Sequence, residues 1–83
     1  MRITVKLFAS LAEYLPPGAQ RNATEVEVPD GASVQEVLDR LDVPQEKTHL
    51  VICNGLYVPH SLRAVETLAA GDTLALWPPV AGG

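Results

Sequence analysis

The C-terminal end of the chain is the part of the sequence whose residue types suggest chemistry. The last ten residues read LALWPPVAGG, so the chain ends on Gly82 and Gly83. Two residues without side chains can enter a channel too narrow for a Cβ atom and can adopt φ values that other residues avoid. The carboxylate of Gly83 is unreactive as it stands, but a partner enzyme that adenylates it with ATP converts it to an acyl-phosphate electrophile. Attack by sulfide or persulfide then gives a terminal thiocarboxylate, which is a sulfur nucleophile on a tether.

The residues before the two glycines suit such a tether. Pro78 and Pro79 fix φ at two successive positions and favour a stiff, extended exit from the preceding strand. Val80 and Ala81, which are small and apolar, continue this segment. Taken alone, however, a Gly-Gly end is more often an unstructured terminus, because chain ends are frequently disordered.

The other reactive side chains form no recognisable active site. Cys53 lies in the most apolar segment and is expected to be a small buried core residue, since free cysteine is among the most buried residue types. His49 and His60 are expected at surface or turn positions, with no third ligand that would make a metal site. No Ser/His/Asp grouping and no phosphate-binding glycine loop has a recognisable context. We therefore expect no catalytic machinery of the chain's own, no metal and no bound cofactor.

Length and charge narrow the class of protein further. The chain has 83 residues, a formal net charge of −4 and one cysteine. This length corresponds to one domain, and a lone cysteine excludes an internal disulfide. Scattered acidic residues argue against a nucleic-acid partner, which requires a basic face. No signal peptide and no apolar run of about 20 residues is found, so we expect a soluble, cytoplasmic protein without a membrane partner.

Alternating apolar and polar residues predict strands in both halves of the chain. ITVKL near the N-terminus and TEVEV further along predict two half-buried strands that pair as a hairpin. In the second half, HLVIC predicts a central strand and NG a two-residue turn. LYVP predicts a short edge strand, because Pro59 removes a backbone donor, and TLALW predicts a last strand.

Two capping boxes predict where helices begin. Ser10 and Glu13 predict a short first helix, which the PPG sequence after it ends. Ser33 and Glu36 predict the start of the main helix. Its apolar residues follow the spacing i, i+3, i+4, i+7 of a buried helical stripe, namely Val34, Val37, Leu38 and Leu41.

The order β-β-α-β-β-β, with an extra short helix in the first connection, predicts an α+β fold. A mixed sheet wrapped on one main helix is the ubiquitin-like β-grasp layout. In it the first and last strands lie side by side at the sheet centre, and a C-terminal tail protrudes. We predict a β-grasp domain over residues 1–77 and an extended Gly-Gly tail over 78–83.

The complete ending PPVAGG, directly after an aromatic-ended strand and a GD turn, is more specific than two glycines alone. It resembles the C-terminal signature of the MoaD/ThiS family of sulfur carriers, in particular its molybdopterin synthase small-subunit branch. ITVKLFA running into SLAEYLPPG, and VICNG followed by AAGDTLALWPP, also look like this family. The likeness therefore covers essentially the full chain.

The resemblance implies a mode of action. It implies a β-grasp fold, activation by an ATP-dependent adenylating enzyme of the ubiquitin-activating type, and a thiocarboxylate on Gly83. In the molybdopterin branch the tail enters a larger subunit, in a heterotetramer, and gives sulfur to a pterin precursor. When the roles of the family's tail are transferred to this sequence, Gly82 keeps the tail narrow and residues 78–81 give it the length to reach the partner's active site. Trp77 and Tyr57 become candidates for the partner interface, with plain core packing as the alternative for both.

The sulfur acceptor and the type of transfer stay open. The double proline favours the molybdopterin branch, since thiamine-type carriers usually lack it, but carriers for tRNA thiolation or cysteine synthesis have similar tails. A ubiquitin-like modifier shares the activation chemistry and joins its last glycine to a lysine of a target. A plain β-grasp interaction module with an accidental Gly-Gly end is a third alternative.

Overall fold

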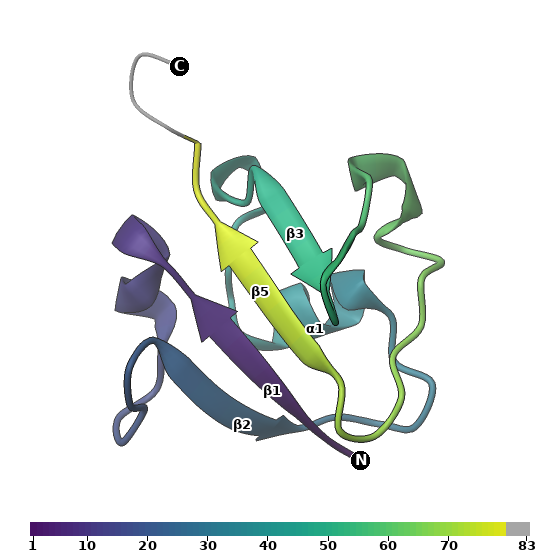
Figure 1. Ribbon diagram of the computed structural model, residues 1–83, viewed down its shortest axis with the longest axis horizontal. Coiled ribbons are helices and arrows are strands. Elements are labelled where there is room, and N and C mark those ends of the chain that lie inside the picture. The colour runs from purple at the N-terminus through teal and green to yellow at the C-terminus, as the bar shows by residue number, and fades with distance from the viewer. Residues whose placement is uncertain (80–83) are drawn as a thin grey trace.

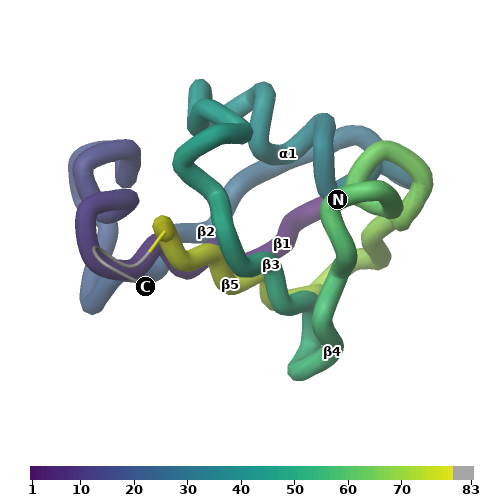
Figure 2. Tube along the Cα trace, turned by 90° about the horizontal axis from the view of Figure 1, so that it is seen from above, coloured from purple at the N-terminus to yellow at the C-terminus, as the bar shows by residue number. Residues whose placement is uncertain are grey.

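The computed structural model describes residues 1–79 of the chain. Within them the strands are β1 (Arg2–Leu7), β2 (Ala23–Glu27), β3 (Leu50–Cys53), β4 (Leu56–Tyr57) and β5 (Thr73–Trp77), and the α-helix is α1 (Val34–Arg40). The strands form one sheet in the order β2-β1-β5-β3-β4. Figure 1 shows the first four of these side by side. The view from above shows α1 on one side of the sheet only (Figure 2). This arrangement confirms the predicted α+β fold with a mixed sheet on one main helix.

The centre of the sheet is the parallel pair of β1 and β5, as the sequence predicted for its first and last strands. Val5 lies opposite Leu74 and Leu7 opposite Leu76 in the parallel register. All four side chains are fully buried, because alternation directs them to the face that α1 covers. The remaining neighbouring pairs of the sheet are antiparallel.

The predicted start of the main helix is confirmed. The Ser33 hydroxyl oxygen accepts a hydrogen bond from the Glu36 N–H (3.1 Å), and the Glu36 carboxylate accepts one from the Ser33 N–H (3.4 Å). Val37 and Leu38 are buried against the sheet, whereas Leu41 at the end of the stripe is only partly buried. The helix has seven residues. No helix within residues 1–79 is long and apolar enough to cross a membrane.

The first connection differs from the prediction in one respect. It contains a 3-10 helix, η1 (Ala9–Tyr14), whose N-cap is Phe8 and which has no side-chain cap bond, so the predicted capping box of Ser10 and Glu13 is wrong. The physical reason is that β1 keeps pairing for one residue more, since the Phe8 N–H donates to the Leu76 carbonyl (3.1 Å). The helix begins directly afterwards, and Ser10 falls inside its first turn.

The predicted NG turn joins β3 to β4. Asn54 and Gly55 have φ values of 51° and 84°, so both central residues are in the left-handed region that a two-residue hairpin turn requires. The Asn54 side chain donates to the Asp72 carboxylate (2.8 Å) and accepts from the Thr73 N–H (2.9 Å). These bonds fasten the turn to the beginning of β5.

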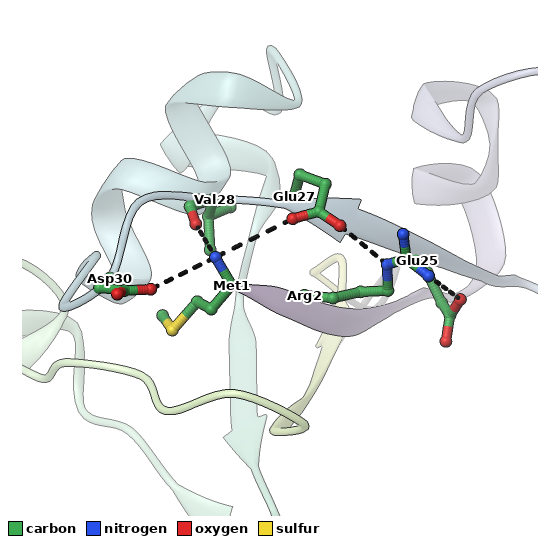
Figure 3. Close-up of polar contacts among 6 residues, drawn as sticks. All are labelled: Met1, Arg2, Glu25, Glu27, Val28 and Asp30. Carbon is green, nitrogen blue, oxygen red and sulfur yellow. Dashed lines mark hydrogen bonds and ion pairs between the residues drawn. The ribbon is translucent and has the colours of Figure 1, made fainter.

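The β1–β2 side of the sheet carries charged side chains (Figure 3). Arg2 Nε donates to the Glu27 carboxylate (2.9 Å), to which it lies opposite in the register. The Met1 ammonium donates to the Val28 carbonyl (2.7 Å) and lies 3.4 Å from the Asp30 carboxylate. Exposed pairs of this kind contribute at most about 1 kcal/mol each, so their main effect is to make this side of the sheet polar.

Candidate functional site

The end of β5, where the predicted tail begins, is held by backbone hydrogen bonds from both neighbouring strands. Phe8 binds the Leu76 carbonyl from the β1 side, and the His49 N–H donates to the Trp77 carbonyl (2.9 Å) from the β3 side. Pro78 follows and has no N–H with which to continue the ladder. The backbone is therefore fixed up to the last residue before the prolines.

Trp77 forms an aromatic stack with Phe8. The ring centroids are 4.7 Å apart and the ring planes differ by 10°. Both side chains are partly buried and lie on the face of the sheet opposite α1, which we call the open face. The parallel register explains the contact, because Leu7 pairs with Leu76 and the next residue of each strand is an aromatic one. The stack holds the indole of Trp77 at the base of the tail.

A shallow hollow lies beside this stack. Its volume is about 460 Å³, and it is lined by Ala9, Ser10, His49, Leu50, Trp77, Pro78 and Pro79. The lining residues come from the end of β5 and from the segments after β1 and before β3. Figure 1 shows these two segments on either side of the end of β5. Mostly apolar walls open to solvent suit an apolar side chain of a partner protein better than a charged small molecule.

The open face continues from this hollow to the edge of the sheet as a row of apolar side chains. Leu50 lies opposite Trp77, Ile52 lies opposite Ala75, and Ile52 also lies opposite Tyr57. Alternation therefore brings both predicted interface residues, Trp77 and Tyr57, to the same face in adjacent rows. Tyr57 is 61% exposed, so core packing does not account for it, whereas Trp77 is partly buried by Phe8 and its neighbours.

The predicted tail residues fall on both sides of the last described residue. Pro78 is partly buried and Pro79 is exposed. The other predicted tail residues, Val80, Ala81, Gly82 and Gly83, lie outside the described residues. Pro78 and Pro79 line the hollow together with Trp77.

Two short helices flank the base of the tail and are bridged by side chains. These are η1 and η2 (Gln45–Lys47), and Lys47 Nζ donates to the Tyr14 hydroxyl at 3.2 Å. The same ammonium lies 5.8 Å from the centre of the Tyr14 ring. The hydrogen bond with Tyr14 raises the pKa of Lys47, so this amine stays protonated at neutral pH and is a poor nucleophile.

Cys53 is less buried than the sequence predicted. It is partly buried at the edge of the core, and its neighbour on β4, Leu56, is 74% exposed. Burial raises the pKa of the Cys53 thiol, and the carboxylates of Asp72 and Glu66 raise it further. A raised pKa disfavours the thiolate, so the environment of Cys53 is opposite to that of a catalytic thiol.

The two histidines are exposed, as predicted. Over residues 1–79 no group of three His, Cys, Asp or Glu side chains is placed to hold a metal ion.

Sequence reasoning missed two residues of this region. Phe8 lies where β1 meets η1, and its stacking on Trp77 was not foreseen. The parallel pairing of the first and last strands was the signal that could have revealed it. Arg63 was not singled out at all, yet it is 2% exposed, and no pattern in the sequence marks it.

Comparisons with known proteins identify the family. The model of the ThiS family matches residues 5–83. Small archaeal modifier protein 1 from Haloferax volcanii is similar in structure, with 32% identity over 95% of this chain and 98% of that chain and a TM-score of 0.67. A protein described as molybdopterin converting factor, subunit 1, from Pyrococcus furiosus is 25% identical over 95% and 98% of the two chains, with a TM-score of 0.67.

A third solved structure supports the assignment of the fold and nothing beyond it. It is described as a complex of subunits 1 and 2 of molybdopterin-converting factor from Helicobacter pylori, and it is 17% identical over the full length of both chains, with a TM-score of 0.61. Among curated proteins no sequence relative was found. The β-grasp layout, the apolar open face and the match over residues 5–83 lead to one conclusion: the chain belongs to the ThiS family, within the MoaD/ThiS group of ubiquitin-like sulfur carriers.

Proposed function

We propose that this chain carries sulfur as a thiocarboxylate on Gly83. The observation that carries the proposal is a ThiS-family chain that ends in Gly82-Gly83 directly after a strand and two prolines. The Gly83 carboxylate attacks the α-phosphate of ATP in an adenylating enzyme, and pyrophosphate leaves. Attack of sulfide on the acyl carbon then releases AMP and leaves sulfur on the chain end. The chain acts as a protein cosubstrate, and the partner enzyme supplies the catalytic groups.

The acceptor that we propose is a pterin precursor in molybdopterin synthesis. The Pro78-Pro79 pair favours this branch, and so does the likeness to the Pyrococcus protein described as subunit 1 of molybdopterin converting factor. Thiamine synthesis, tRNA thiolation and cysteine synthesis are the competing acceptor pathways. They share the activated Gly83, so the acceptor must be identified by the protein that receives the sulfur.

Two partners follow from this proposal. The first is an adenylating enzyme of the ubiquitin-activating type, and the second is the larger subunit of a molybdopterin synthase, in a heterotetramer. We assign both to the open face, because Trp77, Leu50 and Tyr57 present apolar and aromatic surface next to the base of the tail. Exposed aromatic residues are frequent anchors of protein interfaces.

Mass spectrometry tests the proposal directly. The chain is incubated with the adenylating enzyme of its source organism, ATP and a sulfide donor, and the expected result is a gain equal to one oxygen-to-sulfur exchange at Gly83. A variant with one residue added after Gly83 should show no gain while its thermal unfolding is unchanged. No gain in the unaltered chain, with an enzyme shown to release pyrophosphate with it, contradicts the proposal.

A modifier function is the second candidate, and the 32% identity to small archaeal modifier protein 1 favours it. In that case the activated Gly83 is transferred to the ε-amine of a target lysine. Isopeptide-linked adducts that disappear when Gly83 is deleted, detected in cell extracts by peptide mass spectrometry, would identify this function. Capture of a larger subunit without such adducts would favour the carrier.

A further inference from the structure

Arg63 is a buried cation that has no carboxylate partner within residues 1–79. The residue directly follows η3 (His60–Leu62) in the chain and is 2% exposed. Among the ion pairs of residues 1–79, none includes Arg63. Its Nε is buried with no hydrogen-bond partner among the described residues, and burial lowers the pKa of the guanidinium. An unpaired buried charge costs free energy, so a local contact must account for its position.

That contact is a two-pronged hydrogen bond with Thr48. Nη1 of Arg63 donates to the Thr48 hydroxyl oxygen (2.8 Å), and Nη2 donates to the Thr48 carbonyl oxygen (2.9 Å). The Thr48 hydroxyl in turn donates to the Gln45 carbonyl (2.9 Å), so its donor and acceptor roles are both used. The planar guanidinium therefore holds both the backbone and the side chain of Thr48 in one fixed geometry, which the freely rotating donors of a lysine ammonium do not impose.

Thr48 directly precedes the residues that hold the end of β5. The N–H of His49 donates to the Trp77 carbonyl, and Leu50 lies opposite Trp77 in the register. The same two residues, His49 and Leu50, line the hollow beside the base of the tail. A displacement of Thr48 would thus be passed on to Trp77 within two residues.

The backbone of Arg63 is hydrogen-bonded to the main helix. Its carbonyl oxygen accepts a hydrogen bond from the N–H of Gln35 (2.9 Å), which lies in the first turn of α1. Val34 of the same turn donates to the Glu66 carbonyl (3.0 Å). Arg63 therefore links the start of α1, through its backbone carbonyl, to the segment that enters β3, through its side chain.

We propose that Arg63 is a positioning residue, whose guanidinium fork on Thr48 holds His49 and Leu50 against Trp77 and so fixes the base from which the tail is presented. The consequence for activation rests on the proposed carrier function, because only a tail that must reach a partner's active site depends on a fixed base. The consequence for local structure does not rest on it. The two can therefore be measured separately.

Amide hydrogen exchange in the isolated protein tests the local part. The His49 N–H reports on the end of the β3–β5 pair near Arg63, and the Asn54 N–H, which donates to the Thr73 carbonyl (2.9 Å), reports on the far end. In Arg63→Met, exchange at His49 is expected to accelerate on the order of tenfold relative to Asn54, since only the near end loses its anchor. Equal acceleration at both amides, which a general loss of stability would produce, overturns the proposal.

Two further variants keep the test decisive if Arg63→Met does not fold. Thr48→Val removes the hydroxyl acceptor and leaves the carbonyl, so a smaller shift of the same exchange ratio is expected. Arg63→Lys keeps the charge but loses the fork, and it should resemble Arg63→Met. If the lysine variant behaves like the unaltered chain, charge and not the fork positions Thr48, and the proposal is wrong.

Adenylation kinetics test the functional part at a temperature at which every variant is folded. With the adenylating enzyme and ATP, kcat/KM for Arg63→Met is expected to fall several-fold, while Arg40→Met, which removes an exposed arginine from α1, leaves it unchanged. An unchanged kcat/KM for Arg63→Met overturns the link to tail presentation. If the unaltered chain is not adenylated either, the carrier function fails, and the exchange ratio still decides the local role of Arg63.

Discussion

The two faces of the sheet differ in how their apolar side chains are covered. On the face under α1, Val5, Val51 and Leu74 are 0% exposed and belong to one core. On the open face, Trp77 is only partly buried and Tyr57 is 61% exposed. The face under α1 is thus fully covered by the chain itself, whereas the open face is not.

This difference separates the residues that make the fold from those available to a partner. A small domain buries only about 60% of the surface that its unfolded chain exposes, so it needs every side chain of its core. The aromatic and aliphatic residues of the open face are not part of this core. They lie where β5 ends, next to Pro78, which places the uncovered apolar surface beside the proposed reactive tail.

Truncation of the covered face should give the largest loss of stability. Leu38→Ala removes a fully buried side chain from α1, and the free energy of unfolding is expected to fall by about 2–5 kcal/mol because a cavity is left under the helix. Urea unfolding followed by circular dichroism measures it. Arg40→Ala on the exposed side of the same helix should stay within about 0.5 kcal/mol. A small effect for Leu38→Ala would contradict the conclusion that the side chains between α1 and the sheet form the closely packed core.

Removal of the aromatic stack should have an intermediate effect. Phe8→Ala loses the stacking on Trp77, which is worth about 0.5–1.5 kcal/mol beyond the area buried. Because Trp77 is the single tryptophan, its fluorescence emission should shift to the red as the indole becomes more exposed. Phe8→Tyr keeps the ring and serves as the control. A loss as large as that of Leu38→Ala would assign the stack to the core and remove the distinction between the faces.

The sequence predicted the covered face well because its signals are local. Alternation in ITVKL and TLALW and the capping box of Ser33 and Glu36 depend on neighbours within a few residues, and the structure confirms all of them. The same reasoning failed for Ser10, since the start of η1 is set by the pairing of Phe8 with Leu76, far away in the chain. The partial exposure of Cys53 likewise follows from its place at the edge of the core, which no local pattern marks.

The candidate site was predictable only in part. The family resemblance named Trp77 and Tyr57 as interface candidates, but their presence on one face follows from the register of three strands. Arg63 was beyond prediction, because its partner Thr48 lies in another segment and neither residue stands in a recognisable motif. Contacts between segments, in contrast to periodicity within them, are what the sequence alone does not reveal.

The smallest expected effect on stability comes from the edge of the open face, and it gives the sharpest test of docking there. Tyr57→Ser should change the free energy of unfolding by less than about 0.5 kcal/mol, because the side chain is mostly exposed. If the adenylating enzyme docks on the open face, its Kd for the variant should rise about tenfold, which corresponds to about 1.4 kcal/mol for an aromatic anchor. Isothermal titration calorimetry measures this Kd.

Leu56 supplies the matched control for that measurement. It is the neighbour of Tyr57 on β4, it is 74% exposed, and alternation points it to the opposite side of the strand. Leu56→Ser removes as prominent an apolar side chain from the same edge without touching the open face. An unchanged Kd for Leu56→Ser with a weakened Kd for Tyr57→Ser would assign docking to the open face. Equal losses of affinity for the two variants would mean that the partner binds the edge strand of the sheet. A loss of affinity for Leu56→Ser alone would mean that the interface lies away from the open face and the base of the tail.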